Sequence, residues 1–461
     1  MTELVTRPRG EIVTTFTRET VEEISRRNRE PDWLSDRRLA SYANFLRSPM
    51  PTRSDEDYRR TDLRRLDLNA FAPAVEVADP APTAAAKGGA GFGELPPSVA
   101  AVLGDAGKDG GVVVQQGATT LRSSLAEELR AKGVILCSLA EAVRSHPELV
   151  RPYFEHERIG ADEDKWTAMN AAFWTGGVFV YVPSGVEATL PLRSVFAASG
   201  AGQAIFARSL VVAEKWSQLT YVDDCLSTDP AEPGLSAGLV DVVAKEGSAV
   251  RYCHVQNWGT GVWNFERGRF FAQRDAAVNL LQIVFGSRLT KSYLHAHIDE
   301  PGVSVELLGL VFIGGQQHID HSTWQNHRAG QSLSDLLFKC AAVEQARTVY
   351  GGLISIAPGA QRSDAYQNNR NLLLSRAARA DSLPMLEIQA NDVRCTHGST
   401  TSTVDEEELF YAQSRGLPRA EAERLIVEGF FSQVTDRVPL EGVKERVARE
   451  IEQQISRLSF D

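Results

Sequence analysis

Hydrophobic and polar residues alternate with a period of two along most of residues 170–402. Short apolar runs such as residues 178–182 recur there between charged or glycine-containing turns, and a helical period is visible only near residues 332–342. Successive side chains of a β-strand point to opposite faces, so this alternation indicates short strands buried on at least one face. We therefore expect a mainly β core over residues 170–402.

A degenerate repeat runs through this core. Similar segments end in a charged turn at residues 211–217, 242–248 and 270–276, and their alanines Ala213, Ala244 and Ala272 are 31 (244 − 213) and 28 (272 − 244) residues apart. Each unit supplies two strands that cannot bury both faces alone, which favours stacking in register. The repeat predicts a β-solenoid or an irregular antiparallel stack rather than a doubly wound fold, and a two-sheet sandwich is the alternative.

The N-terminal part of the chain has a different pattern. Residues 1–75 form a helical region, with helices expected from Thr20 to Glu30, after a capping box of Thr20 and Glu23, and from Asp36 to Leu46. Residues 76–110 are rich in Ala, Pro and Gly, which predicts a flexible linker. Residues 111–169 are mixed and lead into the core.

The C-terminal region, residues 403–461, returns to a helical pattern. A capping box at residues 403–406 predicts a helix that stops at Gly416, and further helices are expected from Arg419 to about Val434 and from Leu440 to Leu458. Apolar side chains of these helices pack on their own domain or contact a partner. The candidates for partner contact are Leu409, Phe410, Leu425, Ile426, Phe430 and Phe431.

Composition and charge exclude several classes of protein. The 461 residues carry a net charge of −11 and no prominent basic run, so no nucleic-acid surface is expected. The polar N-terminus and the lack of an apolar run of about 18 residues predict neither a signal sequence nor a membrane span. Scattered cysteines without a Cys-x-x-Cys motif predict free thiols in a soluble cytoplasmic protein. They are Cys137, Cys225, Cys253, Cys340 and Cys395.

Five of the nine histidines are concentrated between residues 295 and 327. His295 and His297 on one strand would present two imidazoles on the same face, so a cupin-like metalloenzyme with Glu300 or Glu306 as carboxylate ligand is an alternative. The carboxylates follow His297 by three and nine residues, whereas a cupin motif places its Glu four or five residues after the second His. The other three histidines are His318, His321 and His327, which have Asp and Ser neighbours for hydrogen bonds.

Other catalytic motifs are missing from the sequence. There is no Gly-x-x-x-x-Gly-Lys-Ser/Thr phosphate-binding loop and no Gly-x-Ser-x-Gly nucleophile elbow. A pair of carboxylates for glycoside hydrolysis cannot be assigned, which leaves a carbohydrate-active β-helix enzyme as a distant alternative.

Cys395 and His397 lie at the end of the predicted core. They are two residues apart, so on an extended strand they point to the same face and could contact one ligand. A buried thiol beside a hydrogen-bonded histidine is the simpler interpretation, because a single Cys-x-His is a weak metal motif.

Several ordered segments are similar to one known family. They include Gln367-Asn368-Asn369-Arg370 within residues 359–375, then residues 384–388, Asp392-Val393-Arg394-Cys395-Thr396-His397-Gly398, residues 405–411, and upstream residues 176–183 and 30–34. Over most of its length the chain resembles the SufB/SufD family of iron–sulfur cluster assembly scaffolds. The resemblance implies a right-handed parallel β-helix core with helical ends. It also implies that the ATPase SufC docks on the C-terminal helices and drives a rearrangement of a SufB–SufD pair.

Within the family, the chain resembles SufD more than SufB. SufB proteins have a sulfur-accepting Cys six residues before the proline that aligns with Pro384, where this chain has Ala378, and the segment from Thr396 to Thr400 also departs from SufB. The resemblance implies a non-catalytic scaffold subunit in which His397 is a cluster ligand at the SufB interface, with a less certain role for Cys395. A SufB-type scaffold is the alternative.

The same resemblance also sets expectations for cofactors and partners. The isolated chain is expected to hold no stable cluster, only a transient one in the complex, and to form a homodimer when SufB is missing. Removal of residues 404–461 is expected to abolish SufC binding and to leave the β core folded. Flavin binding, the iron donor and the recipient proteins cannot be deduced.

Overall fold

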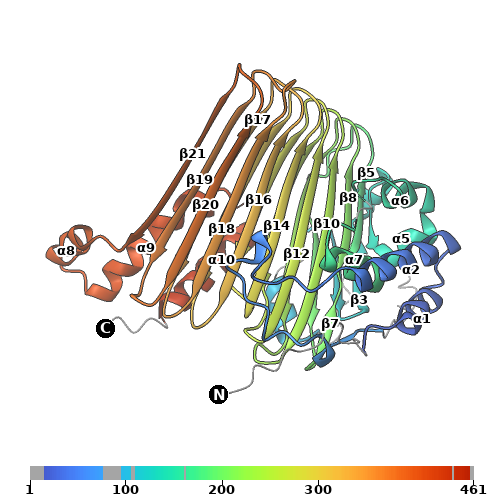
Figure 1. Ribbon diagram of the computed structural model, residues 1–461, viewed down its shortest axis with the longest axis horizontal. Helices are drawn as coiled ribbons and strands as arrows, with labels where there is room; N and C mark the ends of the chain where they lie inside the picture. Colours follow the sequence, from blue (N-terminus) through green and yellow to red (C-terminus); the bar gives the residue numbers. More distant parts are fainter. Residues whose placement is uncertain (1–14, 76–94, 105–108, 160–161, 439–440, 457–461) are drawn as a thin grey trace.

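The computed structural model describes residues 15–75, 95–104, 109–159, 162–438 and 441–456. Its centre is a parallel β-solenoid of about eight turns, so the predicted mainly β solenoid core with helical ends is confirmed. Figure 1 shows the coils stacked side by side, with the blue N-terminal helices at one end and the red C-terminal helices at the other.

After the first coils, successive strands alternate between two sheets, which we call sheet A and sheet B. Sheet A contains β1 (Ala72–Pro73), β4 (Ile135–Ser138), β5 (Val178–Val182), β7 (Gln203–Ile205), β8 (Arg208–Ala213), β10 (Gly234–Ala244), β12 (Val262–Ala272), β14 (Leu289–Ile298), β16 (His318–His327), β18 (Arg347–Ile356) and β20 (Arg379–Ile388). Sheet B contains β2 (Gly111–Gln116), β3 (Thr119–Leu125), β6 (Leu192–Ala198), β9 (Gln218–Ser227), β11 (Ala249–Asn257), β13 (Ala277–Val284), β15 (Ser304–Ile313), β17 (Leu333–Ala342), β19 (Asp364–Leu373) and β21 (Arg394–Thr403).

Each strand pairs in parallel with the strand one coil earlier. Ala244 of β10 is the Cα partner of both Ala213 and Ala272, so the repeat found in the sequence is a physical stack. Among the described residues, only the pairs β2–β3 and β4–β5 are antiparallel, and both lie in the first coils. The irregular antiparallel stack and the two-sheet sandwich are therefore wrong.

The turns after the sheet A strands are also stacked. One residue in each turn after β8, β10, β12, β14, β16 and β18 has a left-handed backbone conformation, as in Trp216 (φ +60°), Gly247 (φ +66°) and Asp275 (φ +56°). The N–H of each of these residues donates a hydrogen bond to the next turn, for example from Gly247 to the carbonyl of Arg274. This ladder offsets the cost of about 1–2 kcal/mol for each non-glycine residue in that conformation.

The helical pattern near residues 332–342 is misleading, because this segment is strand β17. Its side chains at 336, 338 and 340 lie in the interior of the solenoid, while Leu337 and Ala341 pack with the outer apolar cluster. Both faces of the strand are therefore covered by apolar neighbours, and the period-two signal disappears from the sequence.

The N-terminal helices cover the first coils of sheet A. Most of them contribute to one apolar cluster, which includes Phe16, Phe45 and Phe173. They are α1 (Arg18–Asn28), α2 (Asp32–Arg47), the 3-10 helices η1 (Glu56–Tyr58) and η2 (Leu68–Ala70), α4 (Glu127–Ala131), α5 (Leu139–Ser145), α6 (Pro147–Phe154) and α7 (Lys165–Phe173). Thr17 caps α1 by accepting a hydrogen bond from the Thr20 N–H, so the predicted capping box starting at Thr20 is wrong.

The predicted linker, residues 76–110, lies mostly outside the described residues. Within it, α3 (Pro97–Leu103) is a helix, and its Val99 and Leu103 are buried against strands β2 and β6. This part of the range is therefore packed structure rather than an open linker.

The C-terminal helices are α8 (Glu406–Ser414), α9 (Arg419–Thr435) and α10 (Glu441–Ser456). Helices α9 and α10 lie on the outer face of sheet B, and α8 packs against α9. Side chains of α9 and α10 share one apolar cluster with sheet B residues such as Cys253 and Phe312. Asp405 caps α8 by accepting from the Glu407 N–H at 2.8 Å, so the predicted box with Thr403 as its cap is wrong. Within the described residues, no helix is both long and apolar enough to span a bilayer.

Candidate functional site

Cys395 and His397 lie on β21, the last strand of sheet B. Within the part of the chain that the structure describes, β21 pairs only with β19, and β20 ends sheet A in the same way by pairing only with β18. Figure 1 shows β20 and β21 at one end of the stack, with no strand beyond them. We call this end, formed by residues 379–388 and 394–403, the open end of the solenoid.

The backbone of β21 has free hydrogen-bonding groups at the open end. The N–H of Arg394 donates to the carbonyl of Ser363 in the preceding coil, at 3.0 Å. Backbone N–H groups alternate in direction along a strand, so those of Cys395, His397 and Ser399 point away from β19, toward the free edge. Such an edge can pair with a strand of another chain.

The free edge of β20 differs from that of β21 at one position. Arg379 donates its N–H to the carbonyl of Ala346, so the alternate positions of β20, including Pro384, face the free edge. Proline has no N–H and is tolerated in strands where that side is unpaired. The edge of β20 therefore lacks a donor at its centre, whereas β21 has its donors at Cys395, His397 and Ser399.

Cys395 and His397 point to the interior side of the last coil but differ in burial. Cys395 packs against a small apolar cluster, and burial together with Asp364 raises the pKa of its thiol. His397 is exposed, and its register partner one coil earlier is the buried Gln367. Among the described residues, neither belongs to a group of three potential metal ligands.

Ala378 lies just before β20 and is buried among apolar side chains of the last coils. A methyl group therefore occupies the position at which the resemblance leads one to expect a thiol in SufB proteins.

The histidine pair predicted for a cupin-like site does not form one. His295 and His297 lie on the outer face of β14, with ring centroids 6.2 Å apart, beside Trp324. Burial lowers the pKa of His297 to about 3, with Arg158 adding to the effect. The two candidate carboxylates point elsewhere, since Glu300 accepts from the Arg274 N–H and Glu306 contacts Arg437. The cupin-like alternative is wrong.

Of the other three histidines of the cluster, His321 and His327 are buried and His318 is half-buried. Burial lowers the pKa of His318, His321 and His327 to about 4. The two ring nitrogens of His327 lie 2.8 and 2.7 Å from the hydroxyls of Ser332 and Ser334. These contacts give His327 a structural role inside the solenoid.

The six candidate residues for partner contact separate into two groups. Leu409 and Phe431 are fully buried, and Phe430 packs beside Phe431 against sheet B, while Ile426 is half-buried. Phe410 and Leu425 are exposed. Tyr411, which was not selected from the sequence, is also exposed next to Phe410.

A buried cluster of ligand-type side chains was not predicted from the sequence. Asp223 and Cys225 on β9 lie beside His254 on β11 in the solenoid interior. Burial lowers the pKa of His254, but contacts with Asp223 and Glu266 outweigh burial and raise it to about 10. Burial raises the pKa of the Cys225 thiol well above its usual value. The sequence offered one indication of this contact: Asp223 and His254 are 31 residues apart (254 − 223), which is the length of one repeat.

Comparison with known proteins agrees with this architecture. Residues 196–430 match the family described as "SUF system FeS cluster assembly, SufBD core domain". Residues 113–193 match the family described as "SufBD protein N-terminal region". The first match spans the coils from β6 to α9 and includes the open end.

Full-length relatives extend the similarity to nearly the whole chain. The iron–sulfur cluster assembly protein SufD of Bacillus subtilis is 30% identical over 95% of this chain and 97% of its own length. The SufB protein of the same organism is 26% identical over 92% and 90%, and a SufBD family protein of Staphylococcus epidermidis is 27% identical over the same shares. With the fold, the open end and both matched segments in agreement, this chain belongs to the SufB/SufD family of iron–sulfur cluster assembly proteins.

Proposed function

We propose that this chain is the SufD-type scaffold subunit of a SufB–SufC–SufD assembly complex. The open end carries the proposal, because it combines two free strand edges with the exposed imidazole of His397. Strand addition by SufB at β21 would extend sheet B and bring SufB side chains to His397. In this arrangement the cluster site is complete only when both chains are present.

The division of chemistry follows from the side chains at the open end. A neutral imidazole binds iron well, so His397 can supply one ligand to a nascent cluster. The thiol of Cys395 has a raised pKa, and Ala378 has no thiol at all, which leaves little thiolate at the open end of this chain. SufB therefore supplies the thiolates that accept sulfur, and iron and sulfide pass through the site as cargo. This chain acts as a scaffold without a catalytic step of its own.

Reconstitution of the complex tests the ligand role of His397. The wild-type chain and the variants His397→Ala and Ser399→Ala are assembled with SufB and SufC and supplied with iron, a sulfur donor and reductant. Ser399 lies two residues further along β21 on the same face, so it is the matched control. We expect His397→Ala to lower the iron and acid-labile sulfide content several-fold and Ser399→Ala to leave it unchanged. An unchanged cluster content in an intact His397→Ala complex contradicts the role.

We further propose that SufC docks on exposed apolar side chains of α8 and α9. Phe410, Tyr411 and Leu425 are 73%, 61% and 45% exposed, whereas Leu409 and Phe431 anchor the same helices. The double variant Phe410→Asp with Leu425→Asp should weaken SufC binding more than tenfold, measured by calorimetry or pull-down. Leu121→Asp changes an exposed leucine on β3 and is the control. Equal SufC affinity for both variants rules out this docking surface.

A further inference from the structure

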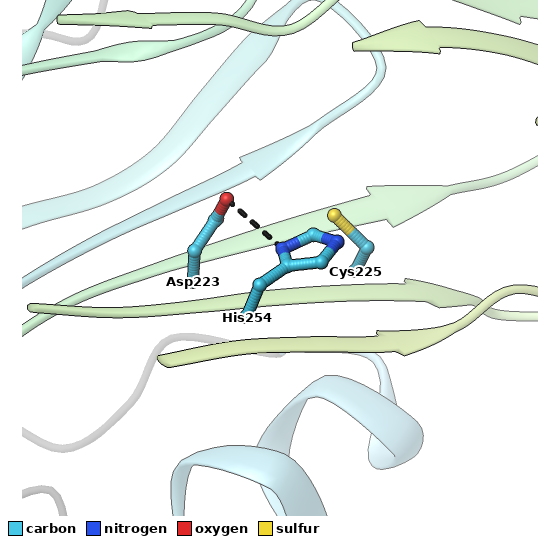
Figure 2. Close-up of side chains that lie close together, drawn as sticks. All are labelled: Asp223, Cys225 and His254. Carbon is cyan, nitrogen blue, oxygen red and sulfur yellow. Dashed lines mark ion pairs between the residues drawn. The ribbon is translucent and has the colours of Figure 1, made fainter. Parts of the chain in front are cut away.

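Asp223, Cys225 and His254 form a compact group inside the solenoid, far from the open end. One potential ligand atom from each lies within 4.8 Å of the others, and all three side chains are buried. Figure 2 shows the Asp223 carboxylate at one end of the imidazole and the Cys225 sulfur beside the ring. Strand β11 is five strand steps from β21 in sheet B, or about 24 Å, so this group is separate from His397.

The strand register explains why these side chains meet. Asp223 and His254 are Cα partners on β9 and β11, and Cys225 follows Asp223 by two residues, so all three point into the interior. Asp223 Oδ2 lies 3.3 Å from His254 Nδ1. Two ligands of one tetrahedral ion, each at about 2.0–2.2 Å from it, are about 3.4 Å apart. The carboxylate and the imidazole are therefore already spaced as a pair of metal ligands.

The ring nitrogens of His254 lack well-formed hydrogen bonds. Its side chain is only 10% exposed, and neither ring nitrogen makes a hydrogen bond of acceptable geometry. The nearest groups are carboxylate oxygens of Asp223 and Glu266 at 3.3 and 3.4 Å, longer than the roughly 2.7–2.9 Å of a charge-assisted hydrogen bond. A buried imidazole in this condition is uncommon and points to a ligand.

The groups around the cluster are arranged as supports for a metal site. Ser194 Oγ donates to Asp223 Oδ1 at 2.7 Å, and Tyr252 donates to Oδ2 at 3.1 Å, which fixes the carboxylate. Glu266 lies at the other ring nitrogen of His254 and is itself held by Gln282 at 2.7 Å. A histidine that binds a metal through one nitrogen commonly donates its other N–H to a carboxylate in this way.

We propose that Asp223, Cys225 and His254 bind one divalent transition-metal ion, Zn²⁺ or Fe²⁺, with Glu266 positioning the imidazole. A thiolate, an imidazole and a carboxylate favour such ions over Mg²⁺ or Ca²⁺, which prefer oxygen ligands. Binding requires a thiolate and a neutral imidazole, so one proton leaves Cys225 and one leaves His254. Two positive charges leave as protons and two arrive with the ion, so the net charge of the buried cluster does not change.

Cobalt substitution tests this site on the full chain without its partners. Co²⁺ is added to the native chain and, because the ligands are buried, also during refolding. Wild type should bind one equivalent with near-ultraviolet thiolate-to-cobalt absorption, and Zn²⁺ should displace it. Fe²⁺ generally binds such sites more weakly than Co²⁺, so it should displace the cobalt only when added in excess under anaerobic conditions. Cys225→Ser should abolish the absorption, and Glu266→Gln should weaken the affinity about 10- to 100-fold.

Two cysteine variants serve as controls. Cys253→Ser removes an equally buried thiol from the opposite face of β11, and Cys395→Ser removes the thiol at the open end. Both should keep the absorption. Its absence from wild type, its persistence in Cys225→Ser, or its loss in Cys395→Ser overturns the proposal. If circular dichroism shows that Cys225→Ser does not fold, cobalt binding is measured in Asp223→Asn. An unchanged cobalt affinity in Asp223→Asn also overturns the proposal.

Discussion

His327 links the charge state of one side chain to the stability of the whole solenoid. It is fully buried on β16, and burial lowers its pKa from 6.5 to about 4. Between these two values the unfolded chain binds a proton at this position and the folded chain does not. Folding stability therefore falls as the pH decreases from 6.5 to 4, and above 6.5 this group has no further effect.

We expect His327 alone to remove up to about 3 kcal/mol of stability across this pH interval. In His327→Gln, an uncharged side chain replaces the imidazole beside Ser332 and Ser334, so the decrease should be smaller by that amount. Urea unfolding of both proteins at several pH values between 7 and 4, followed by circular dichroism, measures the difference. Parallel pH profiles for the two proteins contradict the prediction.

Arg38 illustrates how buried charges attach the N-terminal helices to the solenoid. Its guanidinium pairs with the buried carboxylate of Glu30 and also donates to the carbonyls of Ala172 and Trp174. Removing one partner of a buried pair leaves the other charge without compensation. Arg38→Leu should therefore lower the free energy of unfolding by about 3–5 kcal/mol. Arg18→Leu, which breaks the exposed pair with Glu22, should leave it nearly unchanged in the same assay, because both charges are solvated.

The C-terminal helices stabilise sheet B, which changes how they should be tested. Residues of α9 and α10 share an apolar cluster with strands from β9 to β19, so truncation after Thr403 would expose that face of the sheet. We expect such a truncated chain to lose stability as well as any SufC contact. Point variants on the helices are therefore the better test of docking.

Two phenylalanine variants distinguish the residues of these helices that stabilise the fold from those that are free to contact a partner. Phe431→Ala should cost about 3–5 kcal/mol, because the side chain is fully buried against Phe312. Phe410→Ala should cost less than about 0.5 kcal/mol, because its side chain is 73% exposed. Thermal or urea unfolding measures both variants, and similar losses would show that the division into buried and exposed residues is wrong.

At the level of elements, most of the fold could be predicted from the sequence. The contacts between side chains of neighbouring strands could not, because they depend on the strand register. The alanine spacing at 213, 244 and 272 predicted the stack because a coil of nearly constant length repeats its turn. Strand β17 was obscured because apolar residues cover both of its faces. The contact between Asp223 and His254 needed the pairing of β9 with β11, which degenerate spacings of 31 and 28 residues cannot define to one residue. Cys395 and His397 were found because two residues on one strand are close in sequence.

The whole molecule ends in two sheet edges that differ in their hydrogen-bonding capacity. We expect SufB to pair with β21, where the N–H groups of Cys395, His397 and Ser399 face outward. Ser399→Pro removes one outward donor and leaves the hydrogen bonds to β19 in place, because the Ser399 N–H does not point toward β19. This variant should weaken SufB binding at least tenfold, whereas Ser399→Ala should not. Sedimentation or calorimetry measures the affinity.

The free edge of β21 also predicts the oligomeric state of the isolated chain. A free β21 can pair with a second copy, so the wild-type chain should dimerise without SufB, and Ser399→Pro should shift it toward monomer at equal concentration. Monomer and dimer fractions from light scattering measure this. If Ser399→Pro changes neither SufB binding nor self-association, strand pairing at β21 is not the mode of contact.

The constant register of the coils has a consequence for how a chain of this kind can change in length. Leu333 lies directly over Ser304 in sheet B, and Arg347 lies over His318 in sheet A, so both sheets advance by 29 residues at this coil. A deletion of residues 304–332 would join Val303 to Leu333 and place β17 and β18 where β15 and β16 now lie. Both ends of the molecule would keep their own sequence. A gene for such a protein can gain or lose a segment of this size as one modular unit, whereas a deletion of half that length would exchange the two sheets.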